Sequence, residues 1–315
     1  MAAPFYDFND ALMKPWHLKA TYQLYDQSGN PTEQGTCEYW WASPKVYRST
    51  WTRPSATYSD WHTTDGNHSI LATGESLKYF EKHLQQSMLS PIPYPFLRDS
   101  ASMQLDYRER SRNGTKFPCI SMTRVNQGEA NVTLPNLAPL YCFDQRLPVL
   151  RATIDDSVIV NEFNNIAKIQ GKFLAREILA FVEQHKMFAV QVESVDSMGA
   201  SDSALIPDAR ATLVKTERAD MTHLGSVAAG PPAKTQLPVY PELAMRIHQN
   251  GKVILGGTIG VDGKVHDLDI IYGSSKSFAD AALEAVSHWE YKPCLVNGEP
   301  IEVETTINVV FIPGR

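Results

Sequence analysis

The pattern of residues 251–311 limits what the C-terminal part of this chain can fold into. Residues 253–261 alternate aliphatic side chains with smaller or more polar ones, and the Asp-Gly pair at 262–263 is a strong signal for a tight turn into a second strand. From Phe278 to Trp289, apolar residues recur at helical spacing and form one apolar stripe. We therefore expect a hairpin followed by a helix.

The last segment, about Glu299 to Phe311, predicts one further strand because its side chains alternate. A short helix before the hairpin is predicted at 241–250, with Pro241 near its first turn and Gly251 after its end. The expected order is αββαβ. The predicted inward side of the last strand carries Ile301, Val303, Ile307, Val309 and Phe311, and its other side carries Glu302, Glu304, Thr306 and Asn308.

The topology of these strands leaves one edge unpaired. A hairpin makes its two strands antiparallel, and a crossover helix returns the last strand parallel to the second. A fully antiparallel three-stranded sheet then needs the first strand in the middle, so the last strand becomes a free edge. Such an edge favours pairing with a partner strand or with a second copy of the chain.

The same residues resemble the TonB C-terminal domain family. The resemblance covers residues about 235–315 and is carried by motifs in the family's order: P-V-Y-P-x-x-A from Pro238, D-G-x-V from Asp262, G-S-S from Gly273, W-x-Y-x-P from Trp289 and N-G-x-P from Asn297. It implies a periplasmic domain that receives a short extended segment, the TonB box, from an outer-membrane receptor of the TonB-dependent transport system. Any targeting or anchor segment would lie outside this sequence.

The resemblance also implies which residues contact the receptor segment. For Tyr240 a packing role is as well supported as a contact role, whereas Trp289 is expected to pack the domain. The sequence shows no transmembrane anchor and no long Pro/Lys-rich spacer like those of the family's best-known members, which leaves energy transduction by this chain open. The implied partner-binding residues are Gln236, Leu237, Pro238, Tyr240, Pro241, Glu302, Val303, Glu304, Thr305, Thr306, Ile307, Asn308, Val309 and Val310.

The first two-thirds of the chain predict many short strands and at least one helix. Alternating segments are punctuated by turn signals, whereas residues 76–88 change to helical spacing through Leu77, Phe80, Leu84 and Met88. The segment "REILAFVEQH" is ambiguous between strand and helix. We expect a curved antiparallel sheet, or half-barrel, with helices, so the fold class of the whole chain is α+β.

This N-terminal part resembles, more weakly, the periplasmic lipoprotein carriers LolA and LolB. The resemblance implies a concave face able to hold a lipid or acyl chain. The alternative is that Trp40, Trp41, Trp51 and Trp61 fill an ordinary core. The expected organisation is a half-barrel domain over 1–200, a linker over 201–234 and the TonB-like domain over 235–315.

The four cysteines form no zinc-type spacing. Cys119 and Cys142 lie in two strand-like segments around a turn-rich stretch, so they are candidates for a disulfide in an oxidising compartment. Four separate buried thiols are the equally supported alternative.

Composition and motifs exclude several function classes. A net charge of −6 without a basic run argues against nucleic acid as a partner. No stretch approaches a membrane span, and no catalytic or cofactor fingerprint is present. We therefore expect a binding protein, not an enzyme, with three alternatives: capture of a receptor segment, lipid carriage by the N-terminal domain, or a homodimer through the last strand.

Overall fold

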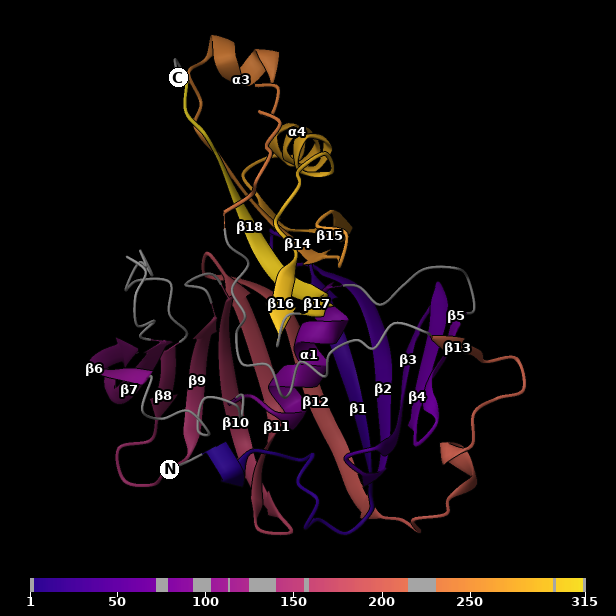
Figure 1. Cartoon of the computed structure of the whole chain (residues 1–315). Coiled ribbons are helices and arrows are strands. Elements are labelled where there is room, and N and C mark those ends of the chain that lie inside the picture. Colours follow the sequence, from indigo (N-terminus) through magenta and orange to yellow (C-terminus); the bar gives the residue numbers. More distant parts are fainter. Residues whose placement is uncertain are drawn as a thin grey trace. The chain divides into compact units, whose positions relative to one another are not determined.

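The computed structural model describes residues 3–71, 79–92, 103–112, 114–124, 140–155, 159–214, 231–296 and 299–313. The chain divides into two compact units, Met1–Glu217 and Arg218–Arg315 (Figure 1). Each unit is described by itself. Among the described residues, no helix is long and apolar enough to cross a membrane.

The N-terminal unit is built from strands, with one α-helix among its described residues. Two short 3-10 helices, η1 and η4, lie near its two ends. The elements are η1 (Ala3–Phe5), β1 (Trp16–Tyr25), β2 (Pro31–Ser43), β3 (Val46–Arg53), β4 (Ala56–Thr63), β5 (Gly66–Leu71), α1 (Tyr79–Leu89), β6 (Met103–Arg112), β7 (Thr115–Arg124), β8 (Leu140–Phe143), β9 (Leu150–Asp155), β10 (Ile159–Ile169), β11 (Lys172–Val182), β12 (His185–Ser197), η4 (Ser203–Leu205) and β13 (Thr212–Val214).

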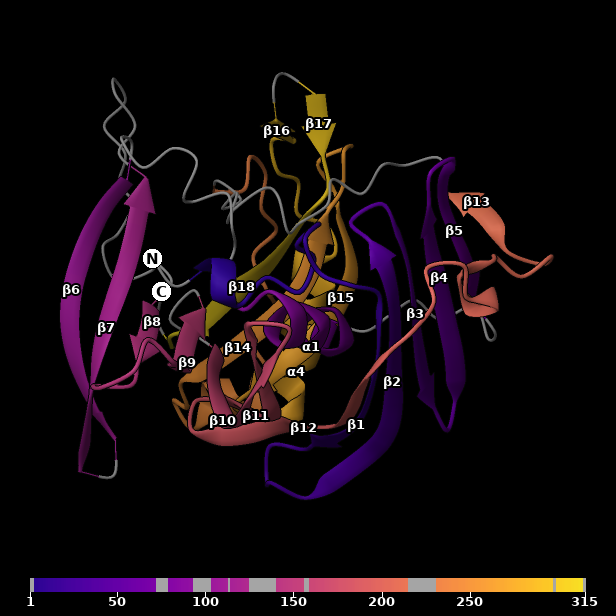
Figure 2. The same ribbon diagram turned by 90° about the horizontal axis from the view of Figure 1, so that it is seen from below.

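These strands form one antiparallel sheet in the order β13-β5-β4-β3-β2-β1-β12-β11-β10-β9-β8-β7-β6. Neighbours in sequence are mostly neighbours in the sheet, and the pairing of β1 with β12 joins the two halves. The sheet curves around α1 (Figure 2). The predicted large antiparallel sheet is confirmed. Of the ambiguous segment 176–185, residues 176–182 belong to β11, residues 183–184 form a turn, and His185 begins β12.

The predicted helix is α1, and a buried polar network fixes it to the concave face. Tyr22 on β1 donates to Glu81 at 2.7 Å, and Arg53 on β3 pairs with the same carboxylate at 3.0 Å. Both ion-pair side chains are almost fully buried. Farther along α1, His83 contacts Asn161 on β10 at 3.1 Å. Because a buried charge needs its partner, this network specifies where the helix sits.

The tryptophans mostly fill the unit. Trp41 and Trp51 are buried on the same side of the sheet as α1, and Trp61 is buried on the opposite side, whereas Trp40 is only partly buried. The filled-core alternative therefore describes three of these four side chains.

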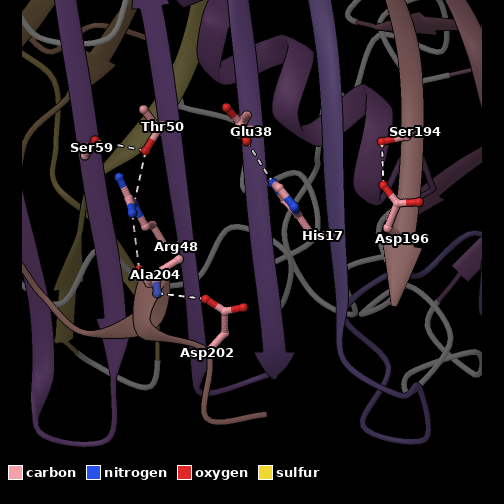
Figure 3. Close-up of polar contacts among 9 residues, drawn as sticks. All are labelled: His17, Glu38, Arg48, Thr50, Ser59, Ser194, Asp196, Asp202 and Ala204. Carbon is pink, nitrogen blue, oxygen red and sulfur yellow. Dashed lines mark hydrogen bonds and ion pairs between the residues drawn. The ribbon is translucent and has the colours of Figure 1, made fainter. Parts of the chain in front are cut away.

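The segment after β12 crosses the convex face of the sheet, as Figure 3 shows. The Ala204 carbonyl accepts hydrogen bonds from Arg48 at 3.3 Å and from the Trp61 indole at 3.0 Å, and Asp202 caps η4. β13 then pairs with β5. The prediction that residues 201–234 are linker is therefore wrong for 201–214, which complete the N-terminal unit; residues 215–230 lie outside the described residues.

Cys119 on β7 and Cys142 on β8 are directly opposite each other and form a disulfide. It joins two strands near the β6 end of the sheet. Cys37 is buried as a free thiol.

The C-terminal unit contains α3 (Glu242–Arg246), β14 (Gly251–Ile259), β15 (Val265–Gly273), α4 (Lys276–Val286), β16 (Cys294–Val296), β17 (Glu299–Ile301) and β18 (Val303–Phe311). Its three-stranded sheet has the order β15-β14-β18, with both pairs antiparallel. The hairpin, the crossover helix and the central position of the first strand are as predicted.

One feature of the predicted last strand is wrong. The strand over 299–311 is two strands, because β17 pairs with β16 while β18 pairs with β14, and the chain changes partner at Glu302. The edge available next to β14 is therefore 303–311.

Candidate peptide-binding edge of the C-terminal unit

The candidate site is the outer edge of β18. All nine residues from Val303 to Phe311 pair with β14 on one side, in the register Ile259↔Val303 to Gly251↔Phe311. No strand among the described residues pairs with the other side. Because backbone groups point alternately to the two sides of an edge strand, every second residue of β18 directs its N–H and C=O away from β14.

The side chains of β18 alternate as the sequence predicts. Val303, Ile307, Val309 and Phe311 are buried in the core of the unit, with relative exposures of 2 to 5%. This side anchors the strand, because each buried aliphatic side chain contributes roughly 1.5 to 3 kcal/mol. The opposite side carries Glu304, Thr306, Asn308 and Val310.

The helix α4 holds this core from one face. Ser275 caps it by accepting from the Phe278 amide, and Phe278, Ala282 and Val286 point into the core. The α4 helix packs on β15 and β14. The Phe278 ring of α4 also meets the Phe311 ring of β18 at 4.8 Å between centroids, and Tyr240 packs against the same core.

Tyr240 belongs to the extended segment that precedes α3, residues 231–241, which we call the lead-in. Its start is held where Lys234 and Glu290 exchange backbone hydrogen bonds, near the β14–β15 turn, because Tyr291 donates to the Gly263 carbonyl of that turn. Its end is held where the Tyr240 ring meets Phe311 at 5.7 Å. The lead-in thus runs from the Val303 end of β18 to its Phe311 end.

The structure gives two of the predicted contact residues a packing role. Tyr240 lies edge-on to both Phe278 and Phe311, and its hydroxyl donates to the Gln249 carbonyl. The Gln236 carbonyl accepts from the Trp289 indole at 2.9 Å. These contacts fix the lead-in against the core, so any effect of Tyr240 on binding first has to be separated from its effect on folding.

The remaining predicted residues fall into two groups. Pro241 is the N-cap residue of α3, and Pro238 is half-buried. Leu237 is 85% exposed and is free to meet a partner. The residues predicted on the last strand, Glu302 to Val310, lie along β18 or directly before it. The structure therefore brings both predicted segments to one side of the unit; partner binding by them stays a prediction.

Sequence reasoning missed two exposed aliphatic residues, Leu243 in α3 and Ile247, the C-cap residue of that helix. An apolar residue in a short amphipathic helix is expected to face the core, and here only Ala244 does so. The short length of the predicted helix was the one signal for this exposure, because so few residues cannot all face inward.

Two ionisable groups of this unit, Tyr291 and Asp262, have shifted pKa values that follow from burial and from the hydrogen bonds of the hairpin turn. Burial raises the pKa of Tyr291 to about 12. The backbone amide of Lys264 and the His266 ring hold the pKa of Asp262 below its ordinary value, which stabilises the hairpin turn. Across the part of the chain that the structure describes, no three His, Cys, Asp or Glu side chains cluster to hold a metal.

Comparison with known proteins supports the recognition of the C-terminal unit. Residues 236–313 match the family model described as the Gram-negative bacterial TonB protein C-terminal. The TonB2 protein of Vibrio anguillarum is 31% identical over 29% of this chain and 88% of that chain, with a TM-score of 0.24. The Pseudomonas aeruginosa TonB C-terminal domain is 25% identical over 27% and 86%, also with a TM-score of 0.24.

For the N-terminal part, the solved structures include a LolA superfamily protein from Nitrosomonas europaea. It is 8% identical over 65% of this chain and 96% of that chain, with a TM-score of 0.40. No curated protein matches the chain. The predicted resemblance to the TonB C-terminal family is thus found, and its family model lies wholly within the C-terminal unit.

Proposed function

We propose that the C-terminal unit, which belongs to the TonB C-terminal family, captures an extended segment of an outer-membrane receptor by adding it as a strand to β18. The observation that carries the proposal is the outer edge of β18, which pairs with no described strand along nine residues. Backbone hydrogen bonds then provide affinity, and the side chains beside the edge provide selectivity.

The composition of β18 supports capture rather than protection of the edge. Natural edge strands avoid unwanted pairing through lysine, proline, bulges or short length. β18 contains no lysine and no proline. Its register with β14 is continuous, and its inward side chains are buried. Such a strand is a preformed template, so a partner loses entropy on binding while the edge itself loses little.

The proposal places the chain in the periplasm. TonB-family function at the outer membrane requires that compartment, and the Cys119–Cys142 disulfide is of a kind that persists in oxidising environments. Receptor capture here links the chain to TonB-dependent transport without assigning it the role of energy transducer.

The proposal is tested with N-methylated peptides and the full chain. A synthetic peptide carrying the box of an outer-membrane receptor is compared with two versions in which three alternate amides are N-methylated, one version for each phase. Only one phase faces β18. Losing three hydrogen bonds of about 1 kcal/mol each weakens binding roughly a hundredfold. The other phase serves as the matched control and binds like the unmodified peptide.

Equal affinities for the two phases, or no binding by any box peptide, would contradict strand addition. Lipid carriage by the N-terminal unit and homodimerisation through β18 stay predictions. Concentration-dependent sedimentation of the free chain separates the homodimer from peptide capture. That the chain is not an enzyme also stays a prediction.

A further inference from the structure

The outermost strand at one end of the N-terminal sheet, β6, has a long edge with no partner strand among the described residues. On its inner side β6 pairs with β7 along its whole length, in a register without a bulge. Figure 2 shows it at the rim of the sheet. The edge strand at the opposite end, β13, is only 3 residues long. An edge as long and regular as that of β6 is able to accept a further strand.

The hairpin of β6 and β7 has little support from the rest of the sheet. β8 pairs with β7 only at Cys119 to Ser121, so residues 109–118 form a ribbon of two strands with no third strand among the described residues. Such a ribbon is marginally stable in water on its own. The Cys119–Cys142 disulfide ties its base to β8 and thereby holds the edge of β6 in place.

The side chains of β6 are suited to contact rather than to solvent alone. Leu105 and Tyr107 are 64 and 70% exposed, and because they are two residues apart in a strand they lie on the same face. Asp106 and Arg108 lie on the other face and are partly buried. β6 contains no lysine and no proline, and its charges are of both signs. Charges on an edge oppose a strand of like charge and favour one of opposite charge.

The order of these charges fits a second copy of the same strand. In a two-fold symmetric antiparallel pair that keeps the same face of both sheets on one side, one residue lies opposite its own copy. If this residue is Asp106, Arg108 or Glu109, a charge faces itself. If it is Tyr107, each Asp106 lies opposite Arg108 of the second copy, and Leu105 lies opposite Glu109. The register centred on Tyr107 therefore avoids these like-charge pairs and makes the Asp–Arg pair twice.

We propose that two copies of the chain associate by pairing their β6 strands antiparallel about Tyr107, which joins their two large sheets. The two Asp106–Arg108 pairs select the register, because opposite charges directly across a strand pair are stabilising. Pairing over residues 103–111 involves fewer residues than the roughly 20 to 30 on each side of a stable interface, so the dimer is weak and depends on concentration. It does not use β18 and is independent of the proposed function.

Sedimentation of the full chain over a range of concentrations tests the pairing by charge reversal. Asp106→Arg and Arg108→Asp each turn two attractive pairs into two repulsive ones, so each weakens the dimer at least about tenfold. An equal mixture of the two variants has opposite charges across both pairs and recovers the affinity of the unmodified chain, which also shows that both variants fold. Asp280→Arg, which reverses a carboxylate on α4, is the matched control and leaves the dimer unchanged.

Cysteine substitution reports the register itself. Residues directly opposite each other have Cα atoms roughly 4.5 to 5.5 Å apart, within the reach of a disulfide. Tyr107→Cys therefore gives a covalent dimer when the full chain is oxidised with glutathione disulfide. Leu105→Cys is the matched control: it is similarly exposed on the same face, but the two copies of residue 105 are offset by roughly 13 Å along the strands, so it gives none. The unmodified chain, whose free Cys37 is buried, provides the background.

The inference is overturned if the chain is monomeric at every concentration, if the mixed charge variants do not recover association, or if Leu105→Cys crosslinks as readily as Tyr107→Cys. A dimer that is unchanged in both charge variants forms through another surface, such as β18, and also overturns it. None of these results affects the capture of a peptide by β18, so the proposed function is tested separately.

Discussion

Replacing Tyr240 separates its role in packing the core from its predicted role in contacting the receptor segment. The ring makes edge-on contacts with Phe278 and Phe311, at 5.6 and 5.7 Å between centroids, and the hydroxyl donates to the Gln249 carbonyl. An aromatic pair contributes roughly 1 kcal/mol beyond burial, and one hydrogen bond contributes about 1 kcal/mol. Tyr240→Ala therefore lowers the free energy of unfolding of the C-terminal unit by about 3 kcal/mol.

The loss is measured by hydrogen exchange of the full chain, followed by mass spectrometry of fragments. A loss of about 3 kcal/mol speeds exchange of the most protected amides of β14 and β18 roughly a hundredfold. Amides of β1 and β11 in the N-terminal unit serve as the internal control and do not change. Fragments of one unit report that unit alone, so the result does not depend on two-state unfolding of the whole chain.

Tyr240→Phe is the matched variant. It keeps both ring contacts and loses the hydroxyl, so exchange in β14 and β18 accelerates only about fivefold. Because its ring still holds the lead-in, the box peptide binds it as tightly as it binds the unmodified chain. If the exchange rates of the β14 and β18 amides rise threefold or less in Tyr240→Ala, the packing role is refuted. If Tyr240→Phe greatly weakens peptide binding, the Tyr240 hydroxyl itself contacts the peptide.

Three further predictions concern the core of each unit. Replacing both Cys119 and Cys142 by serine opens a link across a sequence separation of 23, and chemical denaturation should show a loss of about 3 kcal/mol in the N-terminal unit; an unchanged midpoint would contradict this. Glu81→Gln removes the carboxylate 3.0 Å from the buried Arg53 guanidinium, while Glu33 stays at 3.9 Å, so fragments of α1 and β3 should exchange as if destabilised by about 3 kcal/mol; normal protection would argue against the network. Burial raises the pKa of Tyr291 from about 10 in the unfolded chain to about 12 in the folded one. Between these pH values the folded unit holds the extra proton, so this contribution to stability is complete below pH 10 and is lost as pH rises to 12. Tyr291→Phe should flatten that part of the pH profile, and an unchanged slope would exclude Tyr291 as its source.

Most of the C-terminal unit could be predicted because its pattern is local. The hairpin turn, the stripe of α4 and the alternation of β18 each follow from spacing within a few residues, and handedness then gives the strand order. The change of partner at Glu302 could not be predicted, because alternation continues across it. β18 begins only at Val303 because the preceding residues pair with β16 as β17. This change of pairing partner does not alter the alternation of side chains in the sequence.

The N-terminal unit shows the opposite balance. Its strands and α1 can be predicted from alternation and helical spacing. The pairing of β1 with β12 cannot, because it joins segments far apart in sequence and has no local signal. β13 lies in the range predicted to be a linker, and its three residues are too few to show a period. Its pairing with β5, and the Ala204 carbonyl that receives Arg48 and Trp61, are purely tertiary features.

At the candidate site, sequence indicated the segments but not the roles of their side chains. It placed Tyr240 and Gln236 among the contact residues, and the structure adds packing duties to both. It gave no reason to expect Leu243 and Ile247 in solvent, because an apolar residue at helical spacing normally predicts burial.

The most direct test of strand addition is backbone NMR of the full chain with and without the box peptide, reading amide exchange along β18. Peptide capture predicts that alternate amides between Val303 and Phe311, those directed away from β14, change from fast to slow exchange when the peptide binds. Amides directed toward β14 are already protected and serve as the reference. If the outward amides remain in fast exchange at saturating peptide, the peptide does not extend the sheet and the central claim is wrong.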